Sequence, residues 1–302
     1  MKKFVITTDY TCDIYPEFFE ENNIVRVVMP ITIDGEEYDL ENTKITSKDL
    51  YDKMRAGSSC KTSQANQFDA ITKFNDLLNE GYDILHLCFS SGVSSTFENF
   101  TPTVNELSKK FPDKKIMVVD TLCGSGALGL LLSDCIKLQK DGKTIEEVYS
   151  YCEENKLCYS HYYIVQDLTH LKKGGRINAI EATIGTILGI KPVLSLDYAG
   201  KINVVGKVRG QKKAFKTMID MVMKNIIIPE NDFIIMAHSD CLDDAKEIGN
   251  VLVERTGLEV KYCDLTCIIG SHVGPNTVAV FFKGHERQGQ QSLILPFPVS
   301  NN

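Results

Sequence analysis

A cluster of serines and threonines, Ser90-Ser91-Gly92-Val93-Ser94-Ser95-Thr96, directly follows an apolar segment that is typical of a buried strand. If a helix begins there, its first turn offers free backbone N–H groups and hydroxyl donors, which together bind a carboxylate or a phosphate. An ordinary helix cap formed by Ser94 or Thr96 explains the same residue types equally well. The segment therefore predicts either an anion site or a plain helix N-terminus.

The same segment also permits a serine hydrolase. Its pattern is close to the G-x-S-x-G nucleophile elbow, with Ser94 as the nucleophile and His272 as a base that follows in the order of that class. Thr96 stands where the tight turn of an elbow needs a small residue. Catalysis by Ser94 and His272 is therefore an alternative to binding rather than the favoured interpretation.

His272 is enclosed by glycines in Ile269-Gly270-Ser271-His272-Val273-Gly274-Pro275-Asn276. This spacing predicts a shaped loop rather than the face of a helix. A histidine that merely caps a turn is the other interpretation of this segment.

A literal G-x-G-x-x-G is present at Gly124-Ser125-Gly126-Ala127-Leu128-Gly129. In a dinucleotide-binding fold the first glycine follows the strand closely, whereas here Asp120 to Cys123 intervene. The glycines therefore predict close packing of a helix on the sheet, and nucleotide binding is the weaker alternative.

Basic residues gather in the second half of the chain. They flank Gly174-Gly175 and continue around residue 210, at Lys172, Lys173, Arg176, Lys207, Arg209, Lys212 and Lys213. A solvated face is one explanation, and a surface for an acidic or phosphorylated partner is the other.

Short β-branched segments alternate with helical patterns, which is typical of an α/β chain. In the first half we expect strands over residues 4–7, 26–33, 83–89 and 115–119 and helices over 16–22, 47–56, 67–80, 98–111, 128–139 and 145–156. This order predicts a mainly parallel sheet flanked by helices.

In the second half we expect strands over residues 162–165, 191–196, 202–208, 233–238, 260–265 and 278–282 and helices over 168–173, 180–188, 212–224 and 241–255. A hairpin among these strands makes the second sheet a mixed one. The boundary falls near residue 158, which predicts two α/β domains, 1–158 and 159–302, with a cleft between them.

Composition limits the classes of function. The 302 residues carry a net charge of −7 and are 43% hydrophobic, which is the balance of a globular protein and disfavours a nonspecific nucleic-acid binder. The first apolar segment is too short for a signal peptide, and no apolar segment reaches the roughly 18 residues of a membrane span. The ten cysteines are scattered without a C-x-x-C pair, so we expect free thiols, no metal site and a cytoplasmic protein.

Taken together and in order, these segments resemble the DegV family of bacterial fatty-acid-binding proteins. The resemblance extends from Ile6 to about Gly284 and includes the lipid-binding subunits of the bacterial fatty acid kinase. The segments that carry it are Thr8-Asp9-Tyr10-Thr11-Cys12-Asp13 (T-D-S-T-x-D), Val28-Met29-Pro30-Ile31, Lys61-Thr62-Ser63-Gln64 (K-T-S-Q), Ser90 to Phe97, Asp167 to Ile177 (D-L-x-x-L-x-K-G-G-R-I), Ile190-Lys191-Pro192-Val193-Leu194 and Gly270 to Pro275.

The resemblance implies a long-chain fatty acid in a tunnel at the junction of the two domains. It implies that the first domain supplies the loops that bind the carboxylate and that the second forms the pocket for the acyl chain. Position by position, Thr62 and Ser94 match hydroxyl ligands of the carboxylate, Ser95 matches a backbone N–H donor, and His272 matches the histidine beside the carboxylate.

The resemblance also implies that the chain is not itself an enzyme and holds no cofactor. A separate fatty acid kinase would phosphorylate the bound carboxylate, and the acyl phosphate would pass to an acyltransferase of phospholipid synthesis. We expect the kinase to dock on Lys172, Lys173, Arg176 and Arg209, and the family's role allows a transient membrane contact.

Four positions depart from the family pattern. Tyr10 replaces a small serine and would narrow a cavity or face solvent, and Ser95 stands where the family has glycine. Ala65-Asn66 occupies a place where proline is common, and Asn276 replaces a glycine in a turn that asparagine tolerates. These departures affect the preference for chain length and unsaturation more than the class of ligand.

Overall fold

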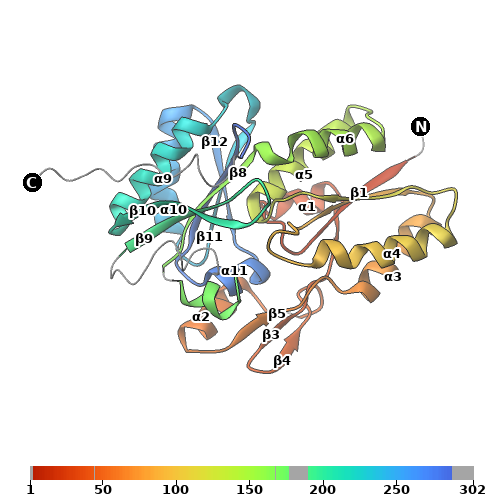
Figure 1. Cartoon of the computed structure of the whole chain (residues 1–302), viewed down its shortest axis with the longest axis horizontal. Helices are drawn as coiled ribbons and strands as arrows, with labels where there is room; N and C mark the ends of the chain where they lie inside the picture. Colours follow the sequence, from red (N-terminus) through yellow and green to blue (C-terminus); the bar gives the residue numbers. More distant parts are fainter. Residues whose placement is uncertain (1–2, 44, 167, 177–189, 288–302) are drawn as a thin grey trace, which may run out of the picture.

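The structure is a computed structural model, and it describes residues 3–43, 45–166, 168–176 and 190–287. Two large sheets lie on either side of helix α5 (Ser125–Lys140), and a small three-stranded sheet projects beside them (Figure 1). Among the described residues, no helix combines the length and the apolar character needed to cross a membrane.

The N-terminal sheet is fully parallel, as expected. Its strand order is β2 (Val25–Val27), β1 (Phe4–Asp9), β6 (Asp83–Cys88) and β7 (Ile116–Asp120). Helices α3 (Gln67–Asn79) and α4 (Thr96–Lys110) cover one face, and α5 and α6 (Ile145–Asn155) cover the other. Because both faces are covered, every residue of β6 is buried, which agrees with its continuous apolar sequence.

The chain reverses its direction of winding between β1 and β6. Strand β2 lies on one side of β1, whereas the later strands β6 and β7 lie on the other. In open α/β sheets the loops at the carboxyl ends of the two strands at such a point enclose a crevice. The loops after β1 and β6 therefore lie where a ligand site is expected.

The C-terminal sheet is mixed, which confirms the second part of the predicted fold class. Its order is β10 (Ile202–Arg209), β9 (Ile190–Leu196), β8 (Tyr159–Ile164), β13 (Val278–Lys283), β11 (Phe233–His238) and β12 (Glu259–Asp264). Strands β11 and β12 pair in parallel and the other neighbours antiparallel. Helices α9 (Gln211–Asn225) and α10 (Leu242–Thr256) cover its outer face. The helix expected over residues 180–188 lies outside the described residues.

Helix α5 joins the two sheets. A Cβ on Gly126 would lie 2.4 Å from the ring of Phe281 on β13, so the glycine lets the helix approach the C-terminal sheet. This confirms the packing interpretation of the G-x-G-x-x-G segment. The largest hydrophobic cluster draws residues from both sides of residue 158, and the division into domains 1–158 and 159–302 stays a prediction.

One predicted strand is wrong. Residues 26–33 form two strands in different sheets, because β2 ends at Val27 and β3 (Ile31–Ile33) begins after Pro30. Proline has no N–H for a sheet ladder, and the N–H of Val28 donates instead to the Asp69 carboxylate at 2.8 Å. Strand β3 pairs with β4 (Glu36–Tyr38) and β5 (Cys60–Thr62), which the sequence did not predict.

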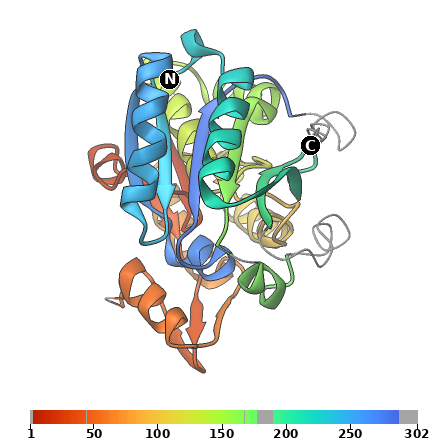
Figure 2. The ribbon, with the colours of Figure 1, turned by 90° about the vertical axis from the view of Figure 1, so that its left-hand side faces the viewer.

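The remaining elements are short or lie at the edges. They are α1 (Glu17–Glu21), α2 (Ser47–Arg55), η1 (Lys156–Cys158), α7 (Thr169–Lys173), η2 (Ile228–Glu230) and α11 (Cys267–Val273). In Figure 2, α11 (blue) lies above the lobe of β3, β4, β5 and α2 (orange), with α7 (green) beside it.

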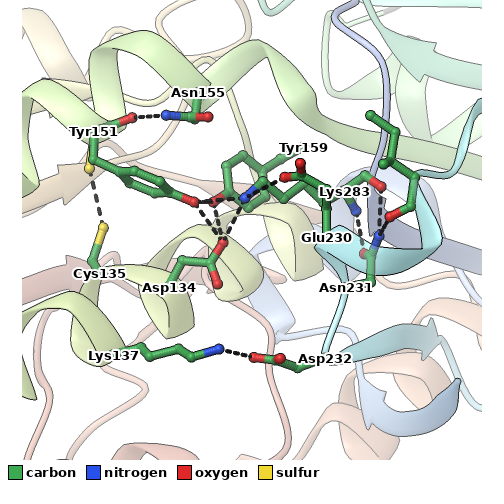
Figure 3. A network of polar contacts seen from close by, with 12 residues as sticks. Asp134, Cys135, Lys137, Tyr151, Asn155, Tyr159, Glu230, Asn231, Asp232 and Lys283 are labelled. Carbon is green, nitrogen blue, oxygen red and sulfur yellow. Dashed lines mark hydrogen bonds and ion pairs between the residues drawn. The ribbon is translucent and has the colours of Figure 1, made fainter. Parts of the chain in front are cut away.

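A polar network fastens α5 and α6 to the C-terminal sheet (Figure 3). The hydroxyls of Tyr151 and Tyr159 donate to Oδ2 of Asp134 at 2.9 and 2.6 Å. The Lys283 ammonium donates to the Tyr151 hydroxyl at 2.9 Å and lies 3.3 Å from the Glu230 carboxylate. Since these residues come from α5, α6, β8, β13 and η2, the network fixes the two sheets relative to each other.

Candidate functional site

A cavity of about 1070 Å³ lies between the two sheets, and the segments that follow β2, β6 and β7 supply part of its lining. The crevice was expected at the loops after β1 and β6, but no described residue of the loop after β1 lines the cavity. Loops and the ends of helices and strands supply much of its polar lining, including Thr62, Ser63, Gln64, Ser91, Ser94, Ser95, Arg176 and His272. The C-terminal sheet and α11 supply most of its apolar lining, including Leu196, Ile202, Leu265, Ile268, Ile269, Val273, Ala279 and Phe281. The cavity thus has the amphipathic lining that a ligand with a polar head and an apolar tail requires.

Thr62 and His272 meet at this cavity. The Thr62 hydroxyl and Nε2 of His272 lie 2.7 Å apart, one at the end of β5 and the other in the last turn of α11. The expectation that His272 lies in a loop is wrong. Its flanking Gly270 is a packing glycine, because a Cβ there would lie 2.3 Å from the Tyr51 hydroxyl, and Gly274 ends the helix with φ +78°.

The His272 ring is neutral at pH 7. Burial, reinforced by the positive charge of Arg176, lowers its pKa to about 4. A neutral imidazole can donate or accept a hydrogen bond at Nε2. If Nε2 donates to the Thr62 oxygen, the Thr62 hydroxyl is free to donate its own hydrogen bond to a ligand. On the other side of the ring, a Cβ on Gly174 would lie 2.4 Å from Nδ1, so the start of the Gly-Gly turn holds the imidazole in place.

The serine cluster forms the N-terminus of α4. The Ser94 hydroxyl lies 2.9 Å from the Thr96 hydroxyl and accepts a hydrogen bond from the Thr96 N–H at 3.2 Å. The N-cap residue is Ser95, whose side chain makes no capping hydrogen bond, so Ser94 satisfies the first N–H of the helix without being the N-cap that one interpretation of the sequence expected. The Ser95 backbone, with φ −85°, is in a conformation that needs no glycine, so its departure from the family pattern causes no strain.

The geometry does not support a serine hydrolase. Such a site needs the nucleophile within hydrogen-bond distance of its base. In the described part of the chain, Ser94 bonds to Thr96, and Nε2 of His272 bonds to Thr62. Both residues line the cavity, but no hydrogen bond between described residues joins them as a nucleophile and its base.

Arg176 lines the cavity, although the sequence predicted a docking role for it. Its Nε donates to the carbonyl of Val93 at 3.3 Å, and Nη1 donates to the carbonyl of Gly174. These partners are neutral, so the half-buried guanidinium retains a positive charge beside Ser94 and His272. The charge of Arg176 makes this end of the cavity suitable for an anion.

The other basic residues of the predicted docking surface lie outside the lining, whereas Lys201, which was not assigned to that surface, is part of the lining. Lys172 and Lys173 are exposed on α7, and Arg209 is exposed at the end of β10. Burial raises the pKa of the Cys60 thiol, the charge of Asp34 raises it further, and the charges of Lys173 and Lys53 oppose this rise.

Sequence reasoning missed the part of β8 that faces the cavity. His161 and Tyr163 alternate with residues of the opposite face, and both line the cavity. His161 accepts a hydrogen bond from the N–H of Gly124 at 3.3 Å. The alternation of polar aromatic residues in Tyr159–Ile164 was the signal for this wall.

The glycine-rich segment does not form a phosphate cradle. A Cβ on Gly124 would lie 2.3 Å from the ring of Phe89, and one on Gly129 would lie 2.4 Å from the carbonyl of Asp13. The chain's own atoms fill the space that a dinucleotide would need. The nucleotide-binding alternative therefore lacks a site at these residues.

Among the described residues, Asp9, His86 and Cys88 form the one group with potential metal ligands close together. Asp9 already accepts hydrogen bonds from the N–H groups of Thr11 and Phe89 at 2.9 and 3.0 Å. His86 bonds to Thr7 at 2.9 Å, so the group belongs to the packing of β1 on β6. The absence of a metal stays a prediction.

Two other departures from the family pattern now have explanations. Tyr10 neither narrows the cavity nor faces solvent, because it is 8% exposed and packs in the core beneath the Arg26 guanidinium, 4.2 Å from the ring centroid. Asn276 adopts φ +59°, which confirms that asparagine replaces glycine in that turn without breaking it.

The sequence matches one protein family over most of its length. Residues 3–284 match the profile of a protein family described as uncharacterised and named DegV. A DegV domain-containing protein of Clostridium perfringens is 38% identical over 290 residues, which cover 95% of this chain and 100% of that protein. A DegV domain-containing protein of Streptococcus pyogenes serotype M3 is 32% identical over 283 residues, covering 93% of this chain and 98% of that protein.

Solved structures share the fold. A DegV lipid-binding protein from Thermotoga maritima superposes with a TM-score of 0.81 at 28% identity and covers 95% of this chain and 100% of its own. A fatty-acid-binding DegV family protein from Streptococcus agalactiae gives a TM-score of 0.83 at 28% identity, with coverage of 95% and 100%. This arrangement of sheets therefore occurs in proteins that bind lipids.

Proposed function

Because the chain belongs to the DegV family, we propose that it binds one long-chain fatty acid in its cavity and presents the carboxylate to a separate fatty acid kinase. The observation that carries this proposal is the cavity itself, which joins a cationic, hydroxyl-lined end to an apolar wall. The related structures from Thermotoga maritima and Streptococcus agalactiae, which bind lipid or fatty acid, support the ligand class.

The carboxylate binds at the Thr62–His272 pair and at the N-terminus of α4. Thr62 and Ser94 supply hydroxyls, Ser95 supplies a backbone N–H, and neutral His272 sets the direction of the Thr62 hydrogen bond. Arg176 supplies the positive charge that balances the carboxylate. Charge-assisted hydrogen bonds of this kind are about twice as strong as neutral ones, which fixes the head of the ligand.

The acyl chain lies along the apolar wall of the C-terminal sheet and α11. Burying about 15 methylenes at roughly 0.8 kcal/mol each contributes about 12 kcal/mol before the cost of ordering the ligand. Affinity of that size means that the fatty acid stays with the protein between encounters with its partners. The protein therefore acts as a carrier, and its polypeptide contributes no catalytic residue.

The chemistry belongs to the partners. The kinase would transfer a phosphoryl group to the bound carboxylate, and the acyl phosphate would pass to an acyltransferase of phospholipid synthesis. Lys172, Lys173 and Arg209 are exposed and cationic, as a docking surface for an acidic partner requires. A cytoplasmic location with transient membrane contact fits this role.

The first experiment is mass spectrometry of lipid extracted from gently purified protein. We expect about one fatty acid per chain, and depletion of it in Ser94→Ala and His272→Ala. Tyr162→Phe, on the opposite face of β8, is the control that keeps its lipid. A folded protein that is empty and does not take up added oleate or palmitate would exclude the proposed function.

A further inference from the structure

A tyrosine hydroxyl lines the cavity without a hydrogen bond. Tyr163 lies on β8, forms part of the cavity wall and is only 9% exposed. Burial alone raises the pKa of its hydroxyl, and no hydrogen bond from the described residues counteracts it. Among the described residues nothing else bonds to this hydroxyl, so a ligand that fills the cavity must either bond to it or leave it unpaired, and an unpaired hydroxyl costs free energy.

The neighbours of Tyr163 explain why the hydroxyl has no partner. It pairs in register with Ala279 on β13 and Leu194 on β9, whose side chains contain no acceptor. Tyr159, four residues earlier on the same face of β8, shows the contrast, because its hydroxyl donates to Asp134 at 2.6 Å. Phenylalanine at position 163 would fill the same space without an unpaired hydroxyl.

We propose that the cavity selects a long-chain fatty acid that carries an oxygen along its chain, a hydroxy or oxo fatty acid, and that this oxygen bonds to the Tyr163 hydroxyl. The inference rests on the proposed function and adds the class of fatty acid to it. With the carboxylate at Thr62 and His272, the chain extends toward the C-terminal sheet, whose wall Tyr163 shares with Ala279 and Phe281.

His161 provides a second polar group on the same wall. It lies two residues before Tyr163 on the same face of β8 and also lines the cavity. Burial and the charge of Arg287 lower its pKa, so the ring is neutral and tolerates an uncharged oxygen nearby. A site that contains buried polar groups discriminates against a ligand that leaves them unpaired. A plain saturated chain is such a ligand here.

The test compares stearate with oleate, with oxostearate and with hydroxystearates whose hydroxyl lies at different carbons, each titrated into delipidated full-length protein. We expect at least one oxygenated chain to bind about 2- to 10-fold more tightly than stearate. Tyr163→Phe is expected to lose this preference while binding stearate at least as tightly as the wild type does. Tyr162→Phe, on the other face of the strand, is expected to keep the preference.

The outcomes separate this inference from the proposed function. If stearate binds and no oxygenated chain is preferred, or if Tyr163→Phe keeps the preference, the inference is wrong and the carrier function stands. If only a cis-unsaturated chain is preferred through Tyr163, the hydroxyl recognises a double bond and the inference is also wrong. If no chain binds the folded wild type, the proposed function fails. Circular dichroism confirms that each variant is folded.

Discussion

The Thr62 hydroxyl lies 2.7 Å from Nε2 of His272, although 210 residues separate them in the chain. Thr62 ends a strand of the small sheet, and His272 lies in the last turn of α11, which connects β12 to β13 of the C-terminal sheet. The Thr62–His272 pair therefore forms only when the two halves of the chain are packed together. Changes that displace α11 are expected to affect ligand binding as strongly as changes to the ligand groups.

Gly174→Ala should displace His272. The new Cβ would lie 2.4 Å from Nδ1 of the ring, so the imidazole or α7 must move. Overpacking of this kind typically costs about 1–3 kcal/mol in the free energy of unfolding. We expect the variant to lose stability in urea unfolding and to bind fatty acid more weakly, because the Thr62–His272 hydrogen bond is broken.

A double-mutant cycle identifies the contact responsible. In a His272→Ala background the ring is absent, so Gly174→Ala should destabilise the protein much less than it does in the wild type. An equal loss of stability in both backgrounds would show that Gly174 acts through another neighbour.

Arg176→Glu should weaken fatty acid binding as well as acyl-phosphate formation. Its guanidinium lines the cavity beside Ser94, so the substituted carboxylate would repel the carboxylate of the ligand. We expect a loss of affinity on the order of tenfold or more, measured by titration with a labelled fatty acid. Unchanged affinity would return Arg176 to the docking role that the sequence suggested.

Arg209→Glu is the matched charge reversal. Arg209 is exposed at the end of β10 and does not line the cavity. It should leave fatty acid affinity unchanged and lower the rate of acyl-phosphate formation by the proposed partner kinase, mainly through slower association that depends on salt. If Arg176→Glu and Arg209→Glu changed fatty acid affinity and the rate of acyl-phosphate formation in the same way, the assignment of Arg176 to the cavity and of Arg209 to docking would be wrong.

The sequence predicted the elements better than the contacts between them. Continuous apolar segments such as residues 83–88 and the capped helices gave the right elements, because their signals are local. The break at Pro30 and the helix that carries His272 were missed, because each depends on distant neighbours. Gly270 lies inside a helix because that helix packs closely on Tyr51. Nothing near position 270 in the sequence indicates this contact.

The same limit applies to the site. The family pattern pointed to Thr62, Ser94, Ser95 and His272, and all four line one cavity. It did not indicate that Arg176 would also line it, because a charge next to a Gly-Gly turn has the same sequence pattern whether it faces solvent or a ligand. Only the contact of Arg176 with the carbonyl of Val93 separates these cases.

Tyr159→Phe should destabilise the junction of the two sheets. Its buried hydroxyl donates to Asp134 at 2.6 Å in the network of Figure 3, and its loss removes one of the hydrogen bonds that stabilise this carboxylate. We expect a cost of about 1–3 kcal/mol in urea unfolding.

Lys137→Met tests whether burial decides this cost. Lys137 and Asp232 also bridge the two halves of the chain, at 2.9 Å, but both side chains are 61% exposed. An exposed ion pair is typically worth about 0–1 kcal/mol, so this variant should be close to the wild type. If Lys137→Met lost more stability than Tyr159→Phe, burial would not be what decides the cost of losing a polar contact at this junction.

Asp13 should make stability depend on pH. Its buried carboxylate accepts hydrogen bonds from the Ser125 hydroxyl at 2.5 Å and the Thr266 N–H at 2.9 Å, which tie α5 and the start of α11 to the loop after β1. Burial raises its pKa from 3.8 to about 7, against the opposing effects of these hydrogen bonds and of Arg26.

The direction of the effect follows from proton linkage. Between about pH 4 and pH 7 the folded protein binds the Asp13 proton and the unfolded chain releases it, so this contribution to stability is lost as the pH rises through 7.

Asp13→Asn cannot titrate and keeps an oxygen for the Thr266 N–H. His272, whose pKa is lowered to about 4, acts in the opposite direction below pH 6.5 and is present in both proteins, so it cancels in their difference. We expect the stability of the wild type relative to Asp13→Asn to fall steadily from pH 4.5 to pH 7.5 in urea unfolding. A difference that does not change with pH would mean that Asp13 stays ionised in the folded protein.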